Sequence, residues 1–479
     1  MKRSLKSTLA FLLAASVLIT MPACGGGSAK PAEPSASASS GNQPDDNVPV
    51  SDGEKVKIVV WGPLESYSEA EKASWNFCVE EYKRRYPNVE IESVFSPPGT
   101  DYRQQYDKAI MAGNAPTVTN LLPYVDVPTR AANGTIADIT SLVENWDLKK
   151  EGKVNPALDE ALCVDGKWYG IMDYIYLAGT PYNKDTLKAG GADPAKLPAT
   201  WDEFIEVCKQ VTDVSVPRFG YLLLGMEWNA WPFTGWVWSA GGEMVEKNTD
   251  GTYKLRFMEE PAIDAAELWN KMIWEYKITQ KDVLKAWNDL RDDMHSGRGA
   301  FAFGRLDHYT SEAETKYGIA PETFGIMPIP AKDSSNNQIC LAGGNAWVFS
   351  PTATDAELKA AWDFAMLVDY DEEFLLKKWE FENSINGLTD RVPARSDMID
   401  KKYEYGTNWP EGWAEEFAVM ASKARPEPFC PHWNDLKNIL ASPLQTILLT
   451  ENISRDEIRK ILEKAADEAY TTYPETFKK

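Results

Sequence analysis

The sequence predicts an α/β fold in which parallel strands are joined by helices. Strand-like apolar runs alternate with amphipathic helical patterns along residues 55–122, which indicates right-handed crossovers between parallel strands. The same alternation resumes after residue 166, where capping-box motifs at Thr200-x-x-Glu203 and Ser454-x-x-Glu457 predict helix starts. Residues 55–479 contain no short-period repeat and no low-complexity linker. They are therefore expected to form one body or two closely joined lobes.

Residues 1–53 are expected to stand outside this fold. Residues 1–23 begin with basic side chains and continue in an apolar run too short to span a bilayer comfortably, which is typical of a secretory signal peptide. The segment Met21-Pro22-Ala23-Cys24 resembles a bacterial lipobox, although Met21 and Pro22 depart from the usual pattern. Residues 24–53 have too few large apolar side chains to order themselves, so they predict a tether lipidated at Cys24. A plain signal peptide with a chance cysteine is the alternative.

The first elements of the body follow from apolar periodicity. Residues 55–61 (KVKIVVW) and 89–95 predict two strands. Between them, apolar side chains over residues 75–86 repeat at helical spacing, and the helix is expected to end before Pro87. A helix over residues 101–112 and a strand over residues 117–122 complete this pattern.

Later elements are marked by turn and capping residues. Asp165-Gly166 predicts a tight turn between two short strands. The helix after Thr200 has an apolar stripe at residues 204–211, and well-patterned helices are expected near residues 261–276 and 355–370. A last helix follows the second capping box.

The charge balance excludes several classes of partner. Fifty Lys and Arg face 72 Asp and Glu, which gives a net charge of -22. Loss of residues 1–23 removes three cations, and 47 against 72 leaves -25. Such a surface repels phosphate backbones and anionic headgroups, so no nucleic acid is expected, and membrane contact is expected only through the lipid anchor.

Cysteine spacing favours buried thiols over a disulfide framework or a metal site. With Cys24 lipidated, five cysteines remain and none lies in a C-x-x-C spacing. They are expected to act as small buried hydrophobes: Cys78, Cys163, Cys208, Cys340 and Cys430.

Four common catalytic or nucleotide-binding motifs are absent from the sequence. It contains no G-x-S-x-G elbow, no H-E-x-x-H, no P-loop and no strand-linked G-x-G-x-x-G. His295, His308 and His432 lie far apart in the chain and are interpreted as surface or polar-network residues. No enzyme activity, cofactor or metal is therefore predicted, although a glycosidase carboxylate pair cannot be identified or dismissed among 72 acidic residues.

The most informative cluster is aromatic. Five large rings fall within eleven residues broken by proline and glycine, without consistent helical or strand periodicity: Trp228, Trp231, Phe233, Trp236 and Trp238. Core packing is one interpretation. A floor for a flat, half-apolar ligand such as a pyranose is the other, because Trp is rarely buried completely.

The order of short segments along residues 55–470 resembles a known family. The segments are KIVVW, EEYKRRYPNVEIE, DYRQQYDKAIMAGNAPTV, NGTIADIT, DGKWYGIMDYIYLAGTPYNKDTL, PATWDEF, WVWSAGGEM, SGRGAFAFG, FGIMPIPA, GGNAWVFS, AAWDFAMLV and GLTDRVPARSDM. Their colinear order is similar to that of extracellular solute-binding proteins, family 1, the maltose-binding-protein-like class that delivers carbohydrates to ABC importers. Thr117 and Pro181 depart from the family pattern.

The resemblance implies a two-lobe periplasmic-binding-protein-like fold with an interlobe ligand cleft. Hinge crossings are then expected near residues 173–182, 317–324 and 366–371. The N-terminal lobe would comprise residues 54–175 and 323–368, and the C-terminal lobe residues 176–322 and 369–479. Closure around ligand would report occupancy to the importer.

The resemblance also implies a set of ligand contacts by local alignment. Rings would stack on sugar faces and polar groups would bind hydroxyls, with Trp231 and Trp433 the strongest candidates. About half of the set is expected to touch ligand: Trp61, Glu65, Tyr124, Asp173, Tyr176, Asn229, Trp231, Arg305, Asp307, Gly344, Asn345 and Trp433.

These inferences together predict a lipid-anchored, non-enzymatic carbohydrate receptor outside the cytoplasm. The expected ligand is an oligosaccharide, since several rings suit more than one sugar unit. The expected partners are membrane-embedded ABC permease subunits, and the chain is expected to be a monomer. A secreted carbohydrate-active enzyme that uses the rings as subsites is the main alternative, and a receptor for a peptide or another non-sugar solute is a third.

Overall fold

The computed structural model describes residues 55–64, 68–96, 102–226, 228–385, 389, 391–405, 410 and 412–479. These residues belong to one contact unit, Val48–Lys479. The predicted signal peptide, the tether and Cys24 lie outside the described residues, and so does Glu65. Within the described part of the chain, no helix is long and apolar enough to cross a membrane.

A mixed sheet of seven strands, here called the first sheet, combines strands from the N-terminal and the C-terminal parts of the described chain. Its order is β14-β6-β13-β3-β1-β2, with β15 paired to β13. The strands are β1 Val56–Leu64, β2 Val89–Ser96, β3 Val118–Pro123, β6 Ile171–Ala178, β13 Cys340–Phe349, β14 Val392–Pro393 and β15 Ala424–Pro426. β1 pairs in parallel with β2 and β3, as the alternation of elements predicts, whereas β13 pairs antiparallel with β3 and β6.

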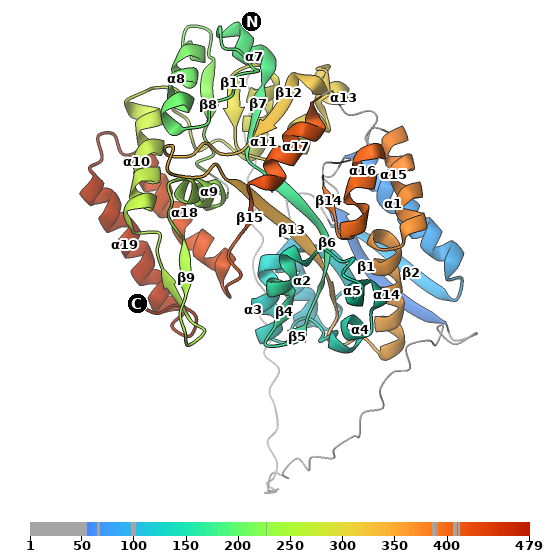
Figure 1. The fold of residues 1–479 in the computed structure, drawn as a ribbon. Coiled ribbons are helices and arrows are strands. Elements are labelled where there is room, and N and C mark those ends of the chain that lie inside the picture. Colours follow the sequence, from blue (N-terminus) through green and yellow to red (C-terminus); the bar gives the residue numbers. More distant parts are fainter. Residues whose placement is uncertain are drawn as a thin grey trace, which may run out of the picture. The chain divides into compact units, whose positions relative to one another are not determined.

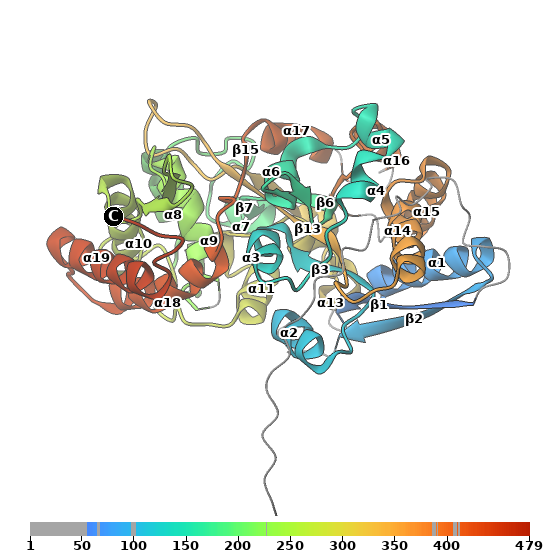
Figure 2. The ribbon, with the colours of Figure 1, turned by 90° about the horizontal axis from the view of Figure 1, so that it is seen from below.

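Helices cover the first sheet through apolar stripes. The main ones are α1 Glu69–Arg85, α2 Tyr102–Ala112, α14 Asp355–Asp369 and α15 Glu372–Ser384. Helix α1 buries Trp75, Cys78, Val79 and Tyr82, which confirms the stripe expected from the sequence. It contacts β1 and β2, beside which it lies in Figure 2. Shorter helices are α3 Val127–Ala132, α4 Thr140–Glu144, α5 Asp147–Lys150, α6 Asp159–Leu162 and α16 Ile399–Tyr405.

A second sheet of four strands has the order β12-β7-β11-β8 among the described residues. Its strands are β7 Thr180–Asn183, β8 Phe219–Leu222, β11 Gly299–Ala302 and β12 Phe324–Met327. The remaining helices are α7 Lys184–Ala189, α8 Trp201–Val211, α9 Ala230–Ser239, α10 Glu260–Trp274, α11 Trp287–His295, α12 Asp307–Thr310, α13 Ala313–Tyr317, α17 Trp413–Ser422, α18 Trp433–Leu449 and α19 Arg455–Thr472. Two hairpins stand apart: β4 Cys163–Val164 with β5 Lys167–Trp168, and β9 Val245–Lys247 with β10 Tyr253–Leu255.

Local signals in the sequence are confirmed where capping and turn chemistry decide the backbone. Thr200 and Ser454 each form a complete capping box at the starts of α8 and α19. Asp165 and Gly166 adopt φ values of 51° and 79° in the tight turn between β4 and β5. The cysteines among the described residues are free, and all except the half-exposed Cys163 are buried.

Strands β6 and β13 connect the two sheets. They pair along most of their length in the first sheet, from Ile171↔Trp347 to Ala178↔Leu341, and Figure 1 shows them side by side. The chain then enters β7 through Gly179, where a Cβ atom would lie 2.5 Å from the backbone oxygen of Met327. Only glycine fits this crossing without displacing the backbone.

The other crossings differ from those drawn from the sequence. Strand β12 begins at Phe324 in the second sheet, so the return to the first sheet comes after it, at β13. Helix α15 packs on α1, α16 packs on α15 and β14, and β14 pairs with β6, so these elements adjoin the first sheet. We therefore propose that one lobe comprises residues 55–178 and 340–405, in place of 54–175 and 323–368. The other would comprise residues 180–327 and 412–479, from which β15 reaches back to pair with β13.

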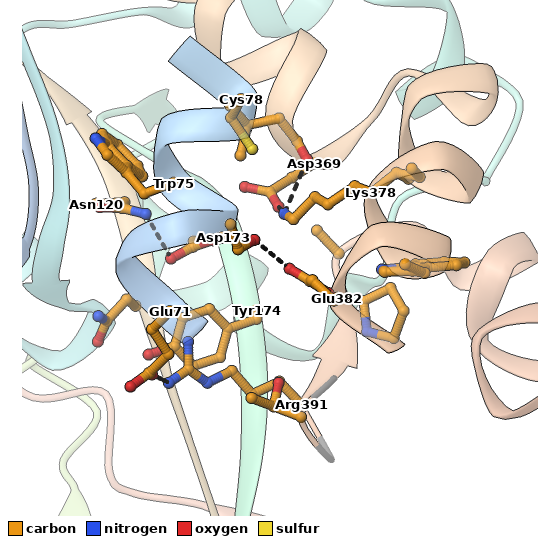
Figure 3. Close-up of a pocket in the computed structure, with 18 of the residues that line it drawn as sticks. Glu71, Trp75, Cys78, Asn120, Asp173, Tyr174, Asp369, Lys378, Glu382 and Arg391 are labelled. Atoms are coloured by element: carbon orange, nitrogen blue, oxygen red, sulfur yellow. Dashed lines mark hydrogen bonds and ion pairs between the residues drawn. The ribbon is translucent and has the colours of Figure 1, made fainter. Parts of the chain in front are cut away.

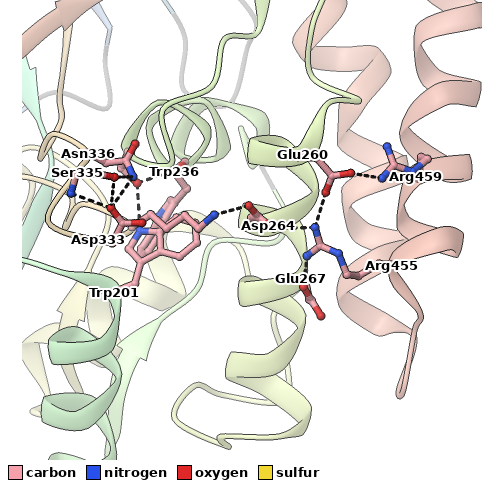
Figure 4. Close-up of polar contacts among 12 residues, drawn as sticks. Trp201, Trp236, Glu260, Asp264, Glu267, Asp333, Ser335, Asn336, Arg455 and Arg459 are labelled. Atoms are coloured by element: carbon pink, nitrogen blue, oxygen red, sulfur yellow. Dashed lines mark hydrogen bonds and ion pairs between the residues drawn. The ribbon is translucent and has the colours of Figure 1, made fainter.

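The C-terminal helix α19 is held to α10 by an ion network (Figure 4). Glu260, Asp264 and Glu267 lie on one face of α10 at helical spacing and all pair with Arg455, the first residue of α19. Asp264 also accepts a hydrogen bond of 2.6 Å from Lys332. The network ties the last helix to the core of the second lobe.

Candidate functional site

The candidate site begins with two tyrosines on strand β6. Tyr174 and Tyr176 are half-buried, while Asp173, Ile175 and Leu177 between and beside them are buried, as the period of two along a strand requires. The two tyrosine ring centroids lie 6.3 Å apart. β6 therefore presents a pair of rings on one face.

Trp231 and Arg305 bring elements of the second lobe to Tyr176. The Trp231 ring, in the first turn of α9, lies edge-on to Tyr176 at 6.0 Å and to Phe303 at 4.8 Å. The Arg305 guanidinium lies 5.0 Å from the Tyr176 ring centroid. The indole Nε1–H of Trp231 is buried and donates to no group among the described residues. Two lobes thus contribute to one cluster of rings, which contains a buried indole N–H without a partner among the described residues.

The position of Arg305 is set by a close backbone approach. Gly179 and Gly304 exchange two backbone hydrogen bonds, of 2.9 and 3.2 Å. Gly304 has a φ of +148°, at the edge of the region that favours glycine. The crossing from β6 to β7 is therefore pinned to the residue that precedes Arg305.

Arg305 forms a two-pronged ion pair with Asp307. Its Nε and Nη2 donate to the two carboxylate oxygens at 2.8 and 2.7 Å. Burial alone raises the pKa of the Asp307 carboxyl, but the adjacent Arg305 guanidinium, followed by His308 and Arg391, lowers the pKa to about 2. The pair therefore stays charged and holds the guanidinium in a fixed orientation beside Tyr176.

A polar cavity of about 120 Å³, here called the first-sheet cavity, adjoins the tyrosine pair (Figure 3). It is lined by residues of α1, β3, β6, β13, α14, α15, β14 and α16, and by Thr389, Arg391 and Ala394. Tyr174 lines the cavity, and the Arg391 guanidinium lies 4.5 Å from the Tyr174 ring centroid. The rings of Trp231, Tyr176 and Tyr174 thus lead in steps of 6.0 and 6.3 Å to this cavity.

Two buried carboxyl groups meet inside the first-sheet cavity. Asp173 accepts a hydrogen bond of 3.1 Å from Asn120, and Asp369 accepts one of 2.7 Å from the Trp347 indole. Lys378 pairs with Asp369 at 3.3 Å. Burial, followed by the charge of Asp369, raises the pKa of Asp173 well above its ordinary value. The shift favours the protonated form of Asp173, which can donate a hydrogen bond.

The structure brings together about half of the site residues expected from the sequence. Tyr176, Trp231, Arg305 and Asp307 form the ring and ion cluster described above. Asp173 and Asn345 line the first-sheet cavity. Trp61 is half-buried inside β1, where it packs edge-on against Tyr106 at 6.3 Å.

Four other expected contacts are closed off by packing. Trp433 is fully buried, and its indole donates to Glu427 at 2.5 Å. Tyr124 is buried against Phe429, and the amide of Asn229 donates to the backbone oxygens of Gly225 and Ala441. The fourth, Gly344, lies inside strand β13 rather than in a loop, and a Cβ atom there would meet the Tyr174 backbone oxygen at 2.4 Å.

The tryptophan-rich segment is mostly core. Residues 230–239 form helix α9 in spite of Pro232 and Gly235, and all of them except Trp231 are buried. Pro232 is tolerated because it lies in the first turn, where its missing N–H has no helical partner. Both interpretations of this cluster therefore apply to different rings: Trp236 and Trp238 pack the core, while Trp231 faces the tyrosines.

Sequence reasoning missed Tyr174, Arg391, Asp369 and Lys378. Tyr174 could have been found from Tyr176, because residues two apart on a strand share a face. Arg391 contacts a tyrosine more than 200 residues earlier in the chain, and no local pattern indicates that contact.

Comparison with known proteins assigns the family. Residues 78–411 match the family described as bacterial extracellular solute-binding protein, and the chain belongs to that family. The family is extracellular, which places the protein outside the cytoplasm. A Brucella abortus (strain 2308) protein named as a binding protein is 24% identical over 398 residues, which cover 77% of this chain and 89% of that protein.

Solved structures share the fold at low sequence identity. An ABC transporter solute-binding protein from Thermotoga lettingae, bound with α-D-tagatose, matches with a TM-score of 0.71 and 20% identity over 87% of this chain and 99% of that one. Lmo0181 from Listeria monocytogenes, in complex with cycloalternan, matches at 0.72 and 19% over 89% and 100%. UgpB from Mycobacterium tuberculosis, in complex with glycerophosphocholine, matches at 0.71 and 17% over 87% and 99%. The predicted two-lobe α/β periplasmic-binding-protein fold is confirmed.

Proposed function

We propose that this chain is the carbohydrate-binding component of an ABC importer, and that it holds an oligosaccharide between its two lobes and releases it unchanged. The observation that carries the proposal is the Tyr176–Trp231 ring pair, 6.0 Å apart, with the Arg305–Asp307 pair beside it. Sugar rings expose C–H faces that pack on aromatic rings, and their hydroxyls require fixed polar partners. Family membership and the sugar-bound relatives support the same ligand class.

Binding between the lobes explains how occupancy would be signalled. Tyr176 belongs to the first sheet, whereas Trp231 and Arg305 belong to elements of the second lobe. A saccharide that contacts both sides stabilises the arrangement in which the two sides lie together, and an empty protein lacks that stabilisation. The permease can then distinguish loaded from empty receptor by the population of this arrangement.

A negatively charged solute is disfavoured by the pairing of the two arginines. Arg305 is committed to Asp307 at 2.7 and 2.8 Å, and Arg391 to Glu71 at 2.6 Å. Each guanidinium is therefore neutralised by a carboxylate. A neutral polyhydroxyl ligand requires no release of these pairs.

The proposal includes lipid anchoring through Cys24 and delivery to permease subunits in the membrane by a monomeric receptor. The lipobox-like segment and the polar, glycine-rich residues after it support the anchor. Replacing Cys24→Ala is expected to move the mature protein from the membrane fraction to the soluble fraction. A variant that stays with membranes would contradict the anchor and leave the binding site untouched.

The binding proposal is tested by titrating the full chain with maltotriose, cellotriose and xylotriose while recording tryptophan fluorescence. At least one trisaccharide is expected to bind at one site per chain. Trp231→Ala is expected to weaken that binding about 30-fold or more, as loss of a central aromatic contact of about 2 kcal/mol requires. Trp168→Ala, a half-exposed tryptophan in the β4–β5 hairpin, is the matched control and should bind as the unaltered chain.

Two results would contradict the proposal. Equal affinity of Trp231→Ala and the unaltered chain would remove the ring pair from the site. Sustained formation of shorter sugars from any trisaccharide would favour the alternative, a secreted carbohydrate-active enzyme. Stoichiometric binding without product supports the receptor.

A further inference from the structure

The first-sheet cavity has apolar walls as well as polar ones. Trp75 and Trp379, both buried, line it together with Leu375 and Val368. The Trp75 indole N–H is already satisfied by Ser93 at 2.7 Å, so the ring contributes apolar surface. Packed rings with a few placed polar groups are typical of small-molecule sites.

The ionised groups of the cavity largely neutralise one another. Glu71 pairs with Arg391 at 2.6 Å, and Asp369 pairs with Lys378 at 3.3 Å (Figure 3). Burial and the neighbouring Asp369 raise the pKa of Asp173, which favours its uncharged form. These five groups together carry no net charge.

The remaining two charged lining groups also balance. Glu382, which accepts a hydrogen bond of 2.5 Å from Ser74, is negative, and Lys402, 6% exposed, is positive. Among the described residues, no group of three His, Cys, Asp or Glu side chains could hold a metal ion. The lining therefore fits a neutral ligand better than an ion.

Hydrogen-bonding capacity remains on several lining groups. Asn120 uses one of its two amide hydrogens on Asp173, and Lys378 has three donors for the Val368 backbone oxygen and Asp369. Protonated Asp173 both donates and accepts. Paired donors and acceptors at fixed positions match the hydroxyl groups of a sugar ring.

The volume of the cavity sets the size of its occupant. At about 120 Å³ it is slightly smaller than an engineered apolar cavity of about 150 Å³ that takes up benzene. A sugar ring with its hydroxyl groups is larger than benzene, so a cavity of this size takes up only part of one ring. A longer ligand must therefore continue outside, where Tyr174 and Tyr176 lie next to the cavity.

We propose that the first-sheet cavity receives the outer edge of the terminal sugar ring of the oligosaccharide, while the following units lie on the Tyr174, Tyr176 and Trp231 rings. The inference rests on the proposed carbohydrate function and adds that the protein recognises one end of the oligosaccharide. A ligand capped at that end would be rejected because the cavity has no room for an added group.

The test compares three forms of each trisaccharide named above: the free sugar, its methyl glycoside, and the sugar O-methylated at position 4 of the non-reducing end. The full chain is titrated with each form by calorimetry. One of the two caps is expected to lower affinity at least tenfold, and the other is expected to have little effect. This readout needs no variant.

A cavity-filling variant provides the second readout. Val368, 3% exposed on α14, lines the cavity and makes no side-chain hydrogen bond that Phe would lose. Val368→Phe is expected to lower affinity for the free trisaccharide at least tenfold and to abolish the difference between the two caps. Val214→Phe, at a residue 74% exposed on the second lobe, is the matched control and should change neither.

The outcomes separate the two proposals. Two results would overturn the inference that the cavity recognises one end of the ligand. The unaltered chain could bind a trisaccharide and tolerate both caps equally, or Val368→Phe could fold and bind that trisaccharide with unchanged affinity. In either case the cavity does not take up sugar. If the unaltered chain binds no sugar of the panel, the proposed carbohydrate function fails first. Thermal unfolding of both variants shows whether a loss of affinity reflects loss of the fold.

Discussion

Asp307 shows how a single buried carboxylate links stability and site geometry. It is 9% exposed, and its two oxygens are bound to Arg305, which lies against the Tyr176 ring. The carboxylate costs desolvation but fixes the guanidinium in one orientation. Charge at this position therefore matters for both the fold and the site.

The lowered pKa of Asp307 predicts an acid-dependent contribution to stability. Its pKa in the folded chain is about 2, below the ordinary 3.8, so the contribution is complete above about pH 4 and is lost as pH falls from about 4 to 2. We expect Asp307→Asn to be less stable than the unaltered chain by about 2 kcal/mol at pH 6, and the difference to vanish near pH 2. Urea unfolding at several pH values measures it. A difference that does not change with pH would contradict the ion pair.

Trp433 is expected to be a packing residue, contrary to its rank among the sequence-based contacts. Its ring is fully buried and its indole donates to the buried carboxylate of Glu427. Trp433→Phe leaves that carboxylate without one donor and is expected to cost about 1–3 kcal/mol of stability. Affinity for the bound trisaccharide should remain within about threefold, measured below the melting temperature. A large loss of affinity in a stable variant would return Trp433 to the site.

At the scale of elements, the sequence predicts features set by neighbouring residues, but not the contacts between segments far apart in the chain. The stripe of α1 and the capping boxes of α8 and α19 depend on residues within a few positions of one another, and the structure confirms them. Helix α9 was not recognised because its apolar residues surround the whole helix, so no amphipathic period exists. Strand β13 contains Gly343 and Gly344, where close packing against β6, far away in the sequence, selects glycine.

The residues of the candidate site also fall into a group that the sequence predicts and a group that it does not. Tyr176, Trp231, Arg305 and Asp307 were reached by resemblance between short segments, and the structure places their side chains together. The first-sheet cavity has no such segment, because its polar groups come from strands and helices far apart in the chain. Asp173 was named, but its partner Asp369 is a buried residue near the end of α14 that no motif distinguishes.

The contact between α10 and α19 yields a prediction about docking of the last helix. Arg455→Ala would leave Glu260, Asp264 and Glu267 close together on α10 with their shared cation removed. Because Arg455 is partly exposed, we expect a loss of about 1 kcal/mol in unfolding free energy, and a smaller one in high salt. Thermal melts at low and high ionic strength provide the measurement. Hydrogen exchange locates the effect: Arg455→Ala is expected to lower the protection of the α19 amides. The control Arg298→Ala leaves the contact between α10 and α19 intact and should keep that protection. Equal protection of α19 in both variants would contradict the docking role.

At the scale of the whole molecule, β6 and β13 are the strands through which the chain passes between the two lobes. β6 carries Tyr174 and Tyr176 and then passes through Gly179 into the second sheet, beside the backbone that holds Arg305. A change of backbone angles at this crossing would therefore move Tyr174 and Tyr176 relative to Trp231. The acidic surface, with a net charge of -22, is consistent with a neutral ligand reaching the site without electrostatic steering.

The most direct measurement is a crystal structure of the full chain with the trisaccharide that binds most tightly. We expect sugar rings against Tyr176 and Trp231, Arg305 or the Trp231 indole donating to a sugar oxygen, and intact glycosidic bonds. A saccharide bound elsewhere, with the Tyr176 and Trp231 rings still packed only against each other, would contradict the proposed site.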